Sequence, residues 1–233
     1  MRPLFPRNRI GPIFKRKRPP DGYLACDEEL LEPVNRIFSR AVKTYGSDPK
    51  AAAWRDKERQ FRRFQIFAGL FETVSDEVGF SVNDLGCGYG AMFEAYQNLP
   101  SFRNARYFGY DISIGMLNEA RTKISDPRAS WIHSHEAIHE ADFSFVSGTY
   151  NLNMGADRDL WRQYIEKNLL QLWSKTRVAL GFNMLSMHSP KRQNSLYYGD
   201  PDHFHTFCQT HMGGRTLLVD RLAPEEFVVF VTR

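Results

Sequence analysis

The segment DLGCGYG at 84–90 stands between a short apolar run and a stretch with helical spacing. Glycine lets the backbone turn tightly and approach a ligand closely, and the free N–H groups of a following helix can face that ligand. Strand, glycine turn and helix in this order open many nucleotide-binding α/β sheets. The segment therefore predicts a parallel α/β fold with a ligand at the turn.

The rest of the chain alternates between β-type and helical patterns. The expected strands are 82–85, 106–110, 129–132, 143–147 and 178–183, the clearest helices between them are 114–124, 157–173 and 201–211, and two β-rich runs at 216–222 and 226–232 close the chain. Alternating β and α units favour a parallel sheet with right-handed crossovers. We expect an α/β, doubly wound, Rossmann-like sheet of seven mostly parallel strands, with an antiparallel last strand and helices on both faces.

Two amphipathic stretches precede the first strand. From Leu30 to Tyr45 the apolar residues recur at helical spacing, and Pro33 predicts that the regular helix begins there, since proline fits a first helical turn. A second helix is expected at about 54–78. We divide the chain into a basic, proline-rich and poorly ordered arm at 1–26, a helical cap at 27–80, and a ligand-binding domain at 81–233.

Charge is distributed unevenly along the 233 residues. The first 20 residues hold seven of the 31 Lys and Arg and no acidic residue, which leaves 24 basic groups against 27 acidic ones. An overall nucleic-acid-binding surface is therefore not expected, whereas the arm at 1–20 suits an anionic partner.

Three scattered cysteines favour a reducing, cytoplasmic compartment, with organelle import as the alternative for the Arg-rich start. No run is long and apolar enough for a membrane span.

An acidic residue, Asp111, closes the second expected strand, 21 residues after Gly90. A carboxylate there can accept hydrogen bonds from both ribose hydroxyls of an adenosine-containing ligand. Gly86, Gly88 and Ala91 also fit the pattern of nicotinamide dinucleotide enzymes, so an oxidoreductase is one interpretation. Asp84 disfavours it, because that position is usually apolar in dehydrogenases and an acid there could receive the amino group of a methionine moiety.

The loop at 84–90 and the segment FGYDIS at 108–113, followed by Met116 and Ala120, resemble the first two motifs of the class I S-adenosylmethionine-dependent methyltransferases. The resemblance covers about residues 54–233. Shorter segments, at 60–64, 147–152, 182–186 and 196–201, resemble a bacterial branch of small, poorly characterised methyltransferases. The family likeness implies S-adenosylmethionine as cofactor and a transferase as enzyme class.

The resemblance also implies which residues contact the cofactor. They are Arg63, Asp84, Gly86, Cys87, Gly88, Gly90, Asp111, Ile112, Met116, His135, Glu136 and Ser147. The glycines would surround the methionine part and Asp111 would hold the ribose. Ile112 and Met116 would sandwich the adenine. Arg63, on the preceding helix, could pair with the methionine carboxylate.

The segment HSHE at 133–136 departs from the family pattern, which usually has an acid near the adenine amine at this point. His135 aligns best with that acid, and Glu136 is one residue off. His135 and His139 could share one helix face, as metal ligands do, but no third ligand at a suitable spacing accompanies them. We therefore expect no metal.

Candidates for chemistry follow the fourth and fifth strands, where open α/β sheets bind ligands. The catalytic candidates are Tyr150, Asn183 and His188, and the substrate candidates are Trp54, Asn151, Tyr197 and Tyr198. An imidazole exchanges protons near neutral pH and suits general-base work. We expect methyl transfer to an O or N atom of an unidentified acceptor, with a small molecule favoured. The alternative is a catalytically silent methyltransferase-like protein that docks through its basic arm on RNA or a large complex.

Overall fold

The computed structural model describes residues 27–45, 57–71 and 79–233. The strands are β1 (Ser81–Leu85), β2 (Arg106–Asp111), β3 (Ala129–His133), β4 (Ala141–Ser147), β5 (Thr176–Leu185), β6 (Arg215–Val219) and β7 (Glu226–Thr232). The α-helices are α1 (Asp27–Tyr45), α2 (Lys57–Ala68), α3 (Ala91–Tyr96), α4 (Ile114–Lys123), α5 (Arg158–Ser174) and α6 (Pro201–Met212). The arm at 1–26 lies outside the described residues.

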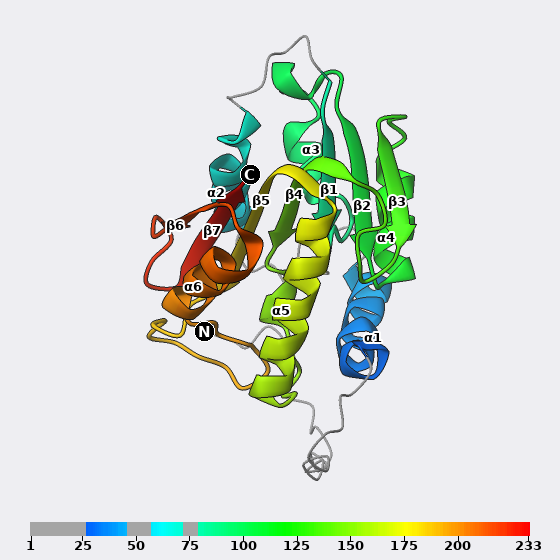
Figure 1. Cartoon of the computed structure of the whole chain (residues 1–233). Coiled ribbons are helices and arrows are strands. Elements are labelled where there is room, and N and C mark those ends of the chain that lie inside the picture. The colour runs from blue at the N-terminus through cyan, green and yellow to red at the C-terminus, as the bar shows by residue number, and fades with distance from the viewer. Residues whose placement is uncertain (1–26, 46–56, 72–78) are drawn as a thin grey trace.

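One seven-stranded sheet has the order β3-β2-β1-β4-β5-β7-β6 (Figure 1). Strands β1 to β5 pair in parallel, and β7 lies antiparallel between β5 and β6. This confirms the expected fold class. The chain order reverses at β1, which has β2 on one side and β4 on the other, and open α/β sheets bind ligands beyond the carboxyl ends of the strands at such a reversal.

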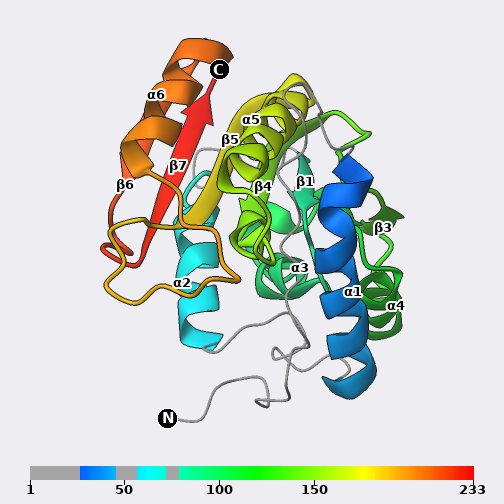
Figure 2. The same cartoon turned by 90° about the horizontal axis from the view of Figure 1, so that it is seen from below.

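The helices cover the sheet in two groups. Trp161 and Leu169 of α5 and Phe204 of α6 pack on one face of the sheet, whereas Phe67 of α2 and Phe93 of α3 pack on the other. Figure 2 shows α1 on the side of β3 and α4, and α2 on the side of β5 and β7. Within the described ranges, no helix combines the length and apolarity that crossing a bilayer requires.

Both N-terminal helices differ from their expected bounds. Helix α1 begins at Asp27 and contains Pro33, so the expectation that Pro33 starts the helix was wrong. Three acidic residues occupy its first turn, where they interact favourably with the positive end of the helix dipole. Helix α2 ends at Ala68, before Gly69, and not near position 78. Residues 54–56 and 72–78 lie outside the described residues.

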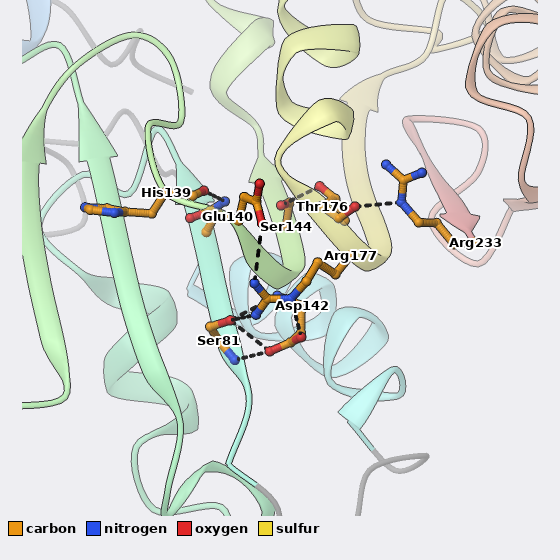
Figure 3. A network of polar contacts seen from close by, with 9 residues as sticks. Ser81, His139, Glu140, Asp142, Ser144, Thr176, Arg177 and Arg233 are labelled. Carbon is orange, nitrogen blue, oxygen red and sulfur yellow. Dashed lines mark hydrogen bonds and ion pairs between the residues drawn. The ribbon is translucent and has the colours of Figure 1, made fainter.

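A polar network ties the amino ends of β1, β4 and β5 together (Figure 3). Asp142 accepts hydrogen bonds from the backbone and hydroxyl of Ser81, both at 2.8 Å, and from Nε of Arg177 at 3.0 Å. Burial alone would raise the pKa of Asp142, but these donors outweigh it and lower the pKa. Arg233 Nε donates to the backbone oxygen of Thr176 nearby. The network lies at the end of the strands opposite the carboxyl edge.

Candidate functional site

A pocket of about 930 Å³, part of it open to solvent, lies at the carboxyl ends of the central strands. Its lining comprises Leu31, Val34 and Phe38 of α1, Gln60 and Phe64 of α2, residues 84–89, 91 and 92, Asp111, Ile112 and Met116, Ser134 and His135, residues 147–149, and Trp161 and Tyr164 of α5. The two N-terminal helices thus form walls of the pocket over the glycine loop. This is the edge of the sheet that the strand order indicates for a ligand.

The glycine loop turns at the end of β1 through residues with positive φ. The N–H groups of Gly86 and Cys87 both donate to the backbone oxygen of Tyr110, at 2.8 and 2.9 Å, which fixes the loop against β2. Gly86 has φ 79°, and a Cβ there would collide with the side chain of Thr149. Gly88 has φ 56°, and a Cβ there would meet nothing within 4 Å. Protein packing therefore requires Gly86, whereas Gly88 leaves open space at the pocket.

The third glycine, Gly90, does not line the pocket. It has φ 86° and caps the N-terminus of α3. A Cβ at this position would lie 2.6 Å from the ring of Trp131 and equally close to Ile124. The structure thus accounts for Gly90 by the packing of the loop on β3 and α4.

Asp111 lies at the end of β2 with 8% of its surface exposed. Its two carboxylate oxygens accept hydrogen bonds from the backbone N–H groups of Gly88, at 2.9 Å, and Ser113, at 2.7 Å. Burial raises its pKa to about 6, against the lowering effect of these donors and of His133. A carboxylate oxygen can accept more than one hydrogen bond, so Asp111 retains capacity for hydroxyl groups of a ligand.

Asp84 lines the pocket at the end of β1 and is 2% exposed. Burial raises its pKa to about 7, the hydrogen bond from the Tyr107 hydroxyl lowers it, and the charge of Asp111 raises it. A carboxyl group in such surroundings would become ionised if a cation entered the pocket beside it. The residue is therefore suited to a positively charged ligand group.

At the other end of the pocket, Ile112, Met116 and His135 line one wall. Glu136 does not line it. Nε2 of His135 lies 3.8 Å from Asp27 Oδ2 and 4.0 Å from Glu136 Oε1. Possible metal-ligand atoms of Asp27, His135 and Glu136 lie within 4.8 Å of one another, close enough to share a metal ion.

Asp27 also pairs with a lysine. Its Oδ2 lies 2.7 Å from Nζ of Lys167, so a side-chain cation already partners this carboxylate. The expectation that no metal binds stays a prediction. Asp27 itself was absent from the expected site, because a partner 108 residues away along the chain leaves no local signal.

Three expected site residues do not line the pocket. Arg63 of α2 forms a bidentate ion pair with Glu226 of β7, and Asn183 Nδ2 donates to the same carboxylate at 3.2 Å. Tyr150 is fully buried, its hydroxyl donates to Asn168 Oδ1 at 2.7 Å, and burial raises its pKa well above the ordinary value. These contacts are all with other groups of the protein, and the roles predicted for the three residues stay predictions.

The remaining candidates belong to the loop after β5 or contact it. His188 is exposed on that loop. Asn151 Oδ1 accepts a hydrogen bond from the backbone of Leu185, and Tyr197 and Tyr198 are buried in the loop. None of these residues lines the pocket. Trp54 lies outside the described residues.

Several lining residues did not emerge from the sequence as site residues. They are Leu31, Val34 and Phe38 of α1, Gln60 and Phe64 of α2, Thr149, and Trp161 and Tyr164 of α5. Most are apolar residues at helical spacing, a pattern that packing against a core also produces. The pattern alone cannot separate a core face from a pocket wall.

Comparison with known proteins indicates the family to which the chain belongs. No family model matches the chain. The candidate methyltransferase Rv1506c of Mycobacterium tuberculosis is 31% identical over 157 residues, which cover 66% of this chain and 93% of that protein.

Solved structures of low sequence identity share the fold. Magnesium protoporphyrin IX methyltransferase ChlM from Synechocystis PCC 6803, crystallised with S-adenosylmethionine, superposes with TM-score 0.62 at 16% identity over 91% of this chain and 99% of its own. The plantazolicin methyltransferase BpumL, in complex with S-adenosylhomocysteine, gives 0.55 at 14% identity over 88% and 98%. The comparisons support neither an oxidoreductase nor a silent binding protein. The chain belongs to the class I S-adenosylmethionine-dependent methyltransferases.

Proposed function

We propose that the pocket binds S-adenosylmethionine and that the protein transfers its methyl group to an O or N atom of a small molecule. The observation that carries the proposal is the pair of buried carboxyl groups, Asp84 and Asp111, at the ends of neighbouring strands, which line the same pocket as Gly88. One carboxylate suits ribose hydroxyls and the other suits a cationic methionine moiety.

The residues along the pocket fit the parts of the cofactor in order. Ile112 and Met116 would contact the adenine, with His135 at its edge, and Asp111 would accept hydrogen bonds from the ribose. The methionine part would lie along the glycine loop beside Asp84. The apolar residues of α1 line the same space, which supports a role for this helix in covering the adenosine.

S-adenosylmethionine would supply a methyl group on a cationic sulfur: the acceptor's lone pair would bond to the methyl carbon, the sulfur would keep the electrons of the broken C–S bond, and a proton carried by the acceptor atom would leave to solvent. The protein's main contribution is then to align the acceptor and to keep water out. Gln60 and Phe64 of α2, together with Trp161 and Tyr164 of α5, give the pocket its side walls. A site recessed beneath two helices suits a small acceptor better than a macromolecule.

Calorimetric titration tests the cofactor assignment. S-adenosylmethionine, S-adenosylhomocysteine and NAD are titrated in parallel into the full-length protein. Micromolar binding of the first two with no binding of NAD supports the proposal and justifies an acceptor screen with methyl-labelled cofactor. Binding of NAD alone, or of none of the three, would contradict it. The anionic partner of the arm and the cytoplasmic location stay predictions.

A further inference from the structure

A buried polar cluster borders the pocket under α2. It consists of Arg63 on α2, Ser147 on β4, Asn183 on β5 and Glu226 on β7, and we call it the Asn183 cluster. Arg63 donates from Nε and Nη2 to the two oxygens of Glu226, each at 2.5 Å. Asn183 donates from Nδ2 to Glu226 Oε2 at 3.2 Å. Arg63, Asn183 and Glu226 are all more than nine-tenths buried.

The ion pair sets the orientation of the Asn183 amide. A carboxylate can only accept hydrogen bonds, so the NH₂ group of the amide must face Glu226 and the carbonyl oxygen must face away. Arg63 binds both carboxylate oxygens of Glu226 and so holds in place the group to which the amide donates. Asn183 therefore presents a hydrogen-bond acceptor whose direction is fixed by two residues behind it.

Two oxygen atoms of this cluster lack hydrogen-bond partners within the described part of the chain. Among the described residues, neither Asn183 Oδ1 nor Ser147 Oγ has a hydrogen-bond partner, although both atoms are buried. Ser147 and Asn183 are register partners on adjacent parallel strands, so their side chains leave the same face of the sheet. A buried polar atom without a partner costs about 1–3 kcal/mol of stability, and native proteins rarely tolerate it without a functional reason.

The order of the strands places this pair at one end of the pocket. Along the carboxyl edge, His135 follows β3, Asp111 ends β2, Asp84 lies in β1 and Ser147 ends β4, with Asn183 next on β5. The proposed cofactor runs from adenine to methionine in this same direction. Ser147 lines the pocket, as does Gln60, one helical turn before Arg63. The pair thus borders the pocket at the end where the methyl acceptor would enter.

We propose that Ser147 Oγ and Asn183 Oδ1 receive an N–H or O–H group of the methyl acceptor and so orient its lone pair toward the methyl carbon. Arg63 and Glu226 act as positioning residues. The inference rests on the proposed function and adds to it the chemistry of the substrate: the acceptor must carry a hydrogen-bond donor at or beside the methylated atom. An amide oxygen and a hydroxyl favour such a donor over an anionic oxygen.

The test uses two cofactor analogues that differ only at the position of the sulfur. In sinefungin a carbon that bears an amine replaces the sulfur that bears the methyl group, so an N–H donor points toward the acceptor position. S-adenosylhomocysteine has no group there. Affinities of both are measured by calorimetry for the full-length protein and for Ser147→Ala and Asn183→Ala, with thermal unfolding of each variant as a folding check.

We expect each variant to bind sinefungin about tenfold more weakly than the unmodified protein, the effect of losing one hydrogen bond to a charged group. Affinity for S-adenosylhomocysteine should stay within about twofold. Asn83→Ala is the matched control. Asn83 is an equally buried asparagine on β1, but it hydrogen-bonds to the backbone of His139 and to Tyr110 and does not line the pocket. Its variant should leave the ratio of the two affinities unchanged.

Glu226→Gln tests the positioning role. A glutamine can donate as well as accept, so the Asn183 amide would no longer have one preferred orientation. The affinity for sinefungin relative to S-adenosylhomocysteine should therefore fall. A loss of thermal stability with an unchanged affinity ratio would show a merely structural role and contradict this part of the inference.

The outcomes separate the two proposals. An equal loss of both ligands in Ser147→Ala and Asn183→Ala would mean that these side chains contact the shared methionine part, which would overturn the inference and leave the proposed function intact. Unchanged affinities for both ligands would also overturn it. Failure of the unmodified protein to bind either ligand would overturn the proposed function itself.

Discussion

Arg63 and Glu226 form a buried ion pair that joins α2 to β7, 163 residues apart in the chain, with two N···O distances of 2.5 Å. Both side chains are about 5% exposed or less. The pair therefore links the N-terminal helix that walls the pocket to a strand near the C-terminus. Buried charges of this kind depend strongly on each other, because either one left alone would be desolvated without compensation.

Arg63→Met should lower the free energy of unfolding by about 3–5 kcal/mol, because it leaves the Glu226 carboxylate buried without its cation. The double variant Arg63→Met, Glu226→Met should recover most of that loss. Urea unfolding measures both. Arg62→Met is the control: Arg62 pairs with Glu58 on the exposed side of the same helix, and this pair should contribute about 1 kcal/mol or less. Equal effects at both positions would show that the buried pair does not stabilise α2.

Gly88→Ala should weaken the binding of S-adenosylmethionine by at least about tenfold with only a modest loss of stability. Its positive φ strains any other residue by about 1–2 kcal/mol, and the added methyl group would occupy space at the pocket. Gly155 has φ 77° and equally open surroundings but does not line the pocket. Gly155→Ala should therefore lose similar stability and keep full affinity. Calorimetry and thermal unfolding of the pair provide the test.

Affinity for S-adenosylmethionine should fall as the pH is lowered from about 8 to 5.5. With a pKa of about 7, Asp84 is largely protonated in the free protein below neutral pH, and binding of the cationic amino group of the methionine part favours the ionised form. Binding at low pH must then displace a proton. S-adenosylhomocysteine carries the same amino group and should show the same trend. Asp84→Asn should reduce the pH dependence for both ligands; a pH dependence that is unchanged in this variant would contradict the role.

Asp111→Ala should abolish binding of S-adenosylmethionine, because it removes the carboxylate proposed for the ribose and the acceptor for the Gly88 N–H. Asp142→Ala is a suitable comparison, since Asp142 also accepts a backbone hydrogen bond but lies at the opposite end of the strands. That variant should lose stability and keep its affinity. Fluorescence or calorimetric titration after a folding check measures both. Unchanged affinity in the Asp111 variant would refute the ribose assignment.

Deletion of residues 1–20 should leave cofactor affinity unchanged, because the first pocket residue along the described chain is Leu31. The measurement is the same titration on the shortened chain. If an anionic partner binds through the arm, retention on a phosphate-bearing matrix should fall in the deletion variant. A large loss of cofactor affinity would place the arm at the pocket.

The central strands and the glycine loop could be predicted from the sequence because their signals are local. The bounds of β1 to β4 agree with the apolar runs to within two residues, and β7 has its expected ends. The glycine turn after β1 and the acid at the end of β2 can likewise be recognised from residues that are close together in the chain. The preference of proline for the first turn of a helix gave the wrong start for α1, because Pro33 lies inside this helix. Packing on α4 and the pocket wall evidently outweighs the strain of one proline.

By itself, then, the sequence determined the doubly wound fold, the ligand turn at Gly88 and the acid at Asp111. Only the tertiary structure decided the partners of Arg63 and Asn183. Both residues meet at Glu226, and nothing near 63 or 183 in the chain indicates a carboxylate on β7. Backbone conformation follows from adjacent residues, whereas the contacts of a buried polar side chain depend on which strands and helices become neighbours. That arrangement is set by burial of apolar surface over the whole sheet.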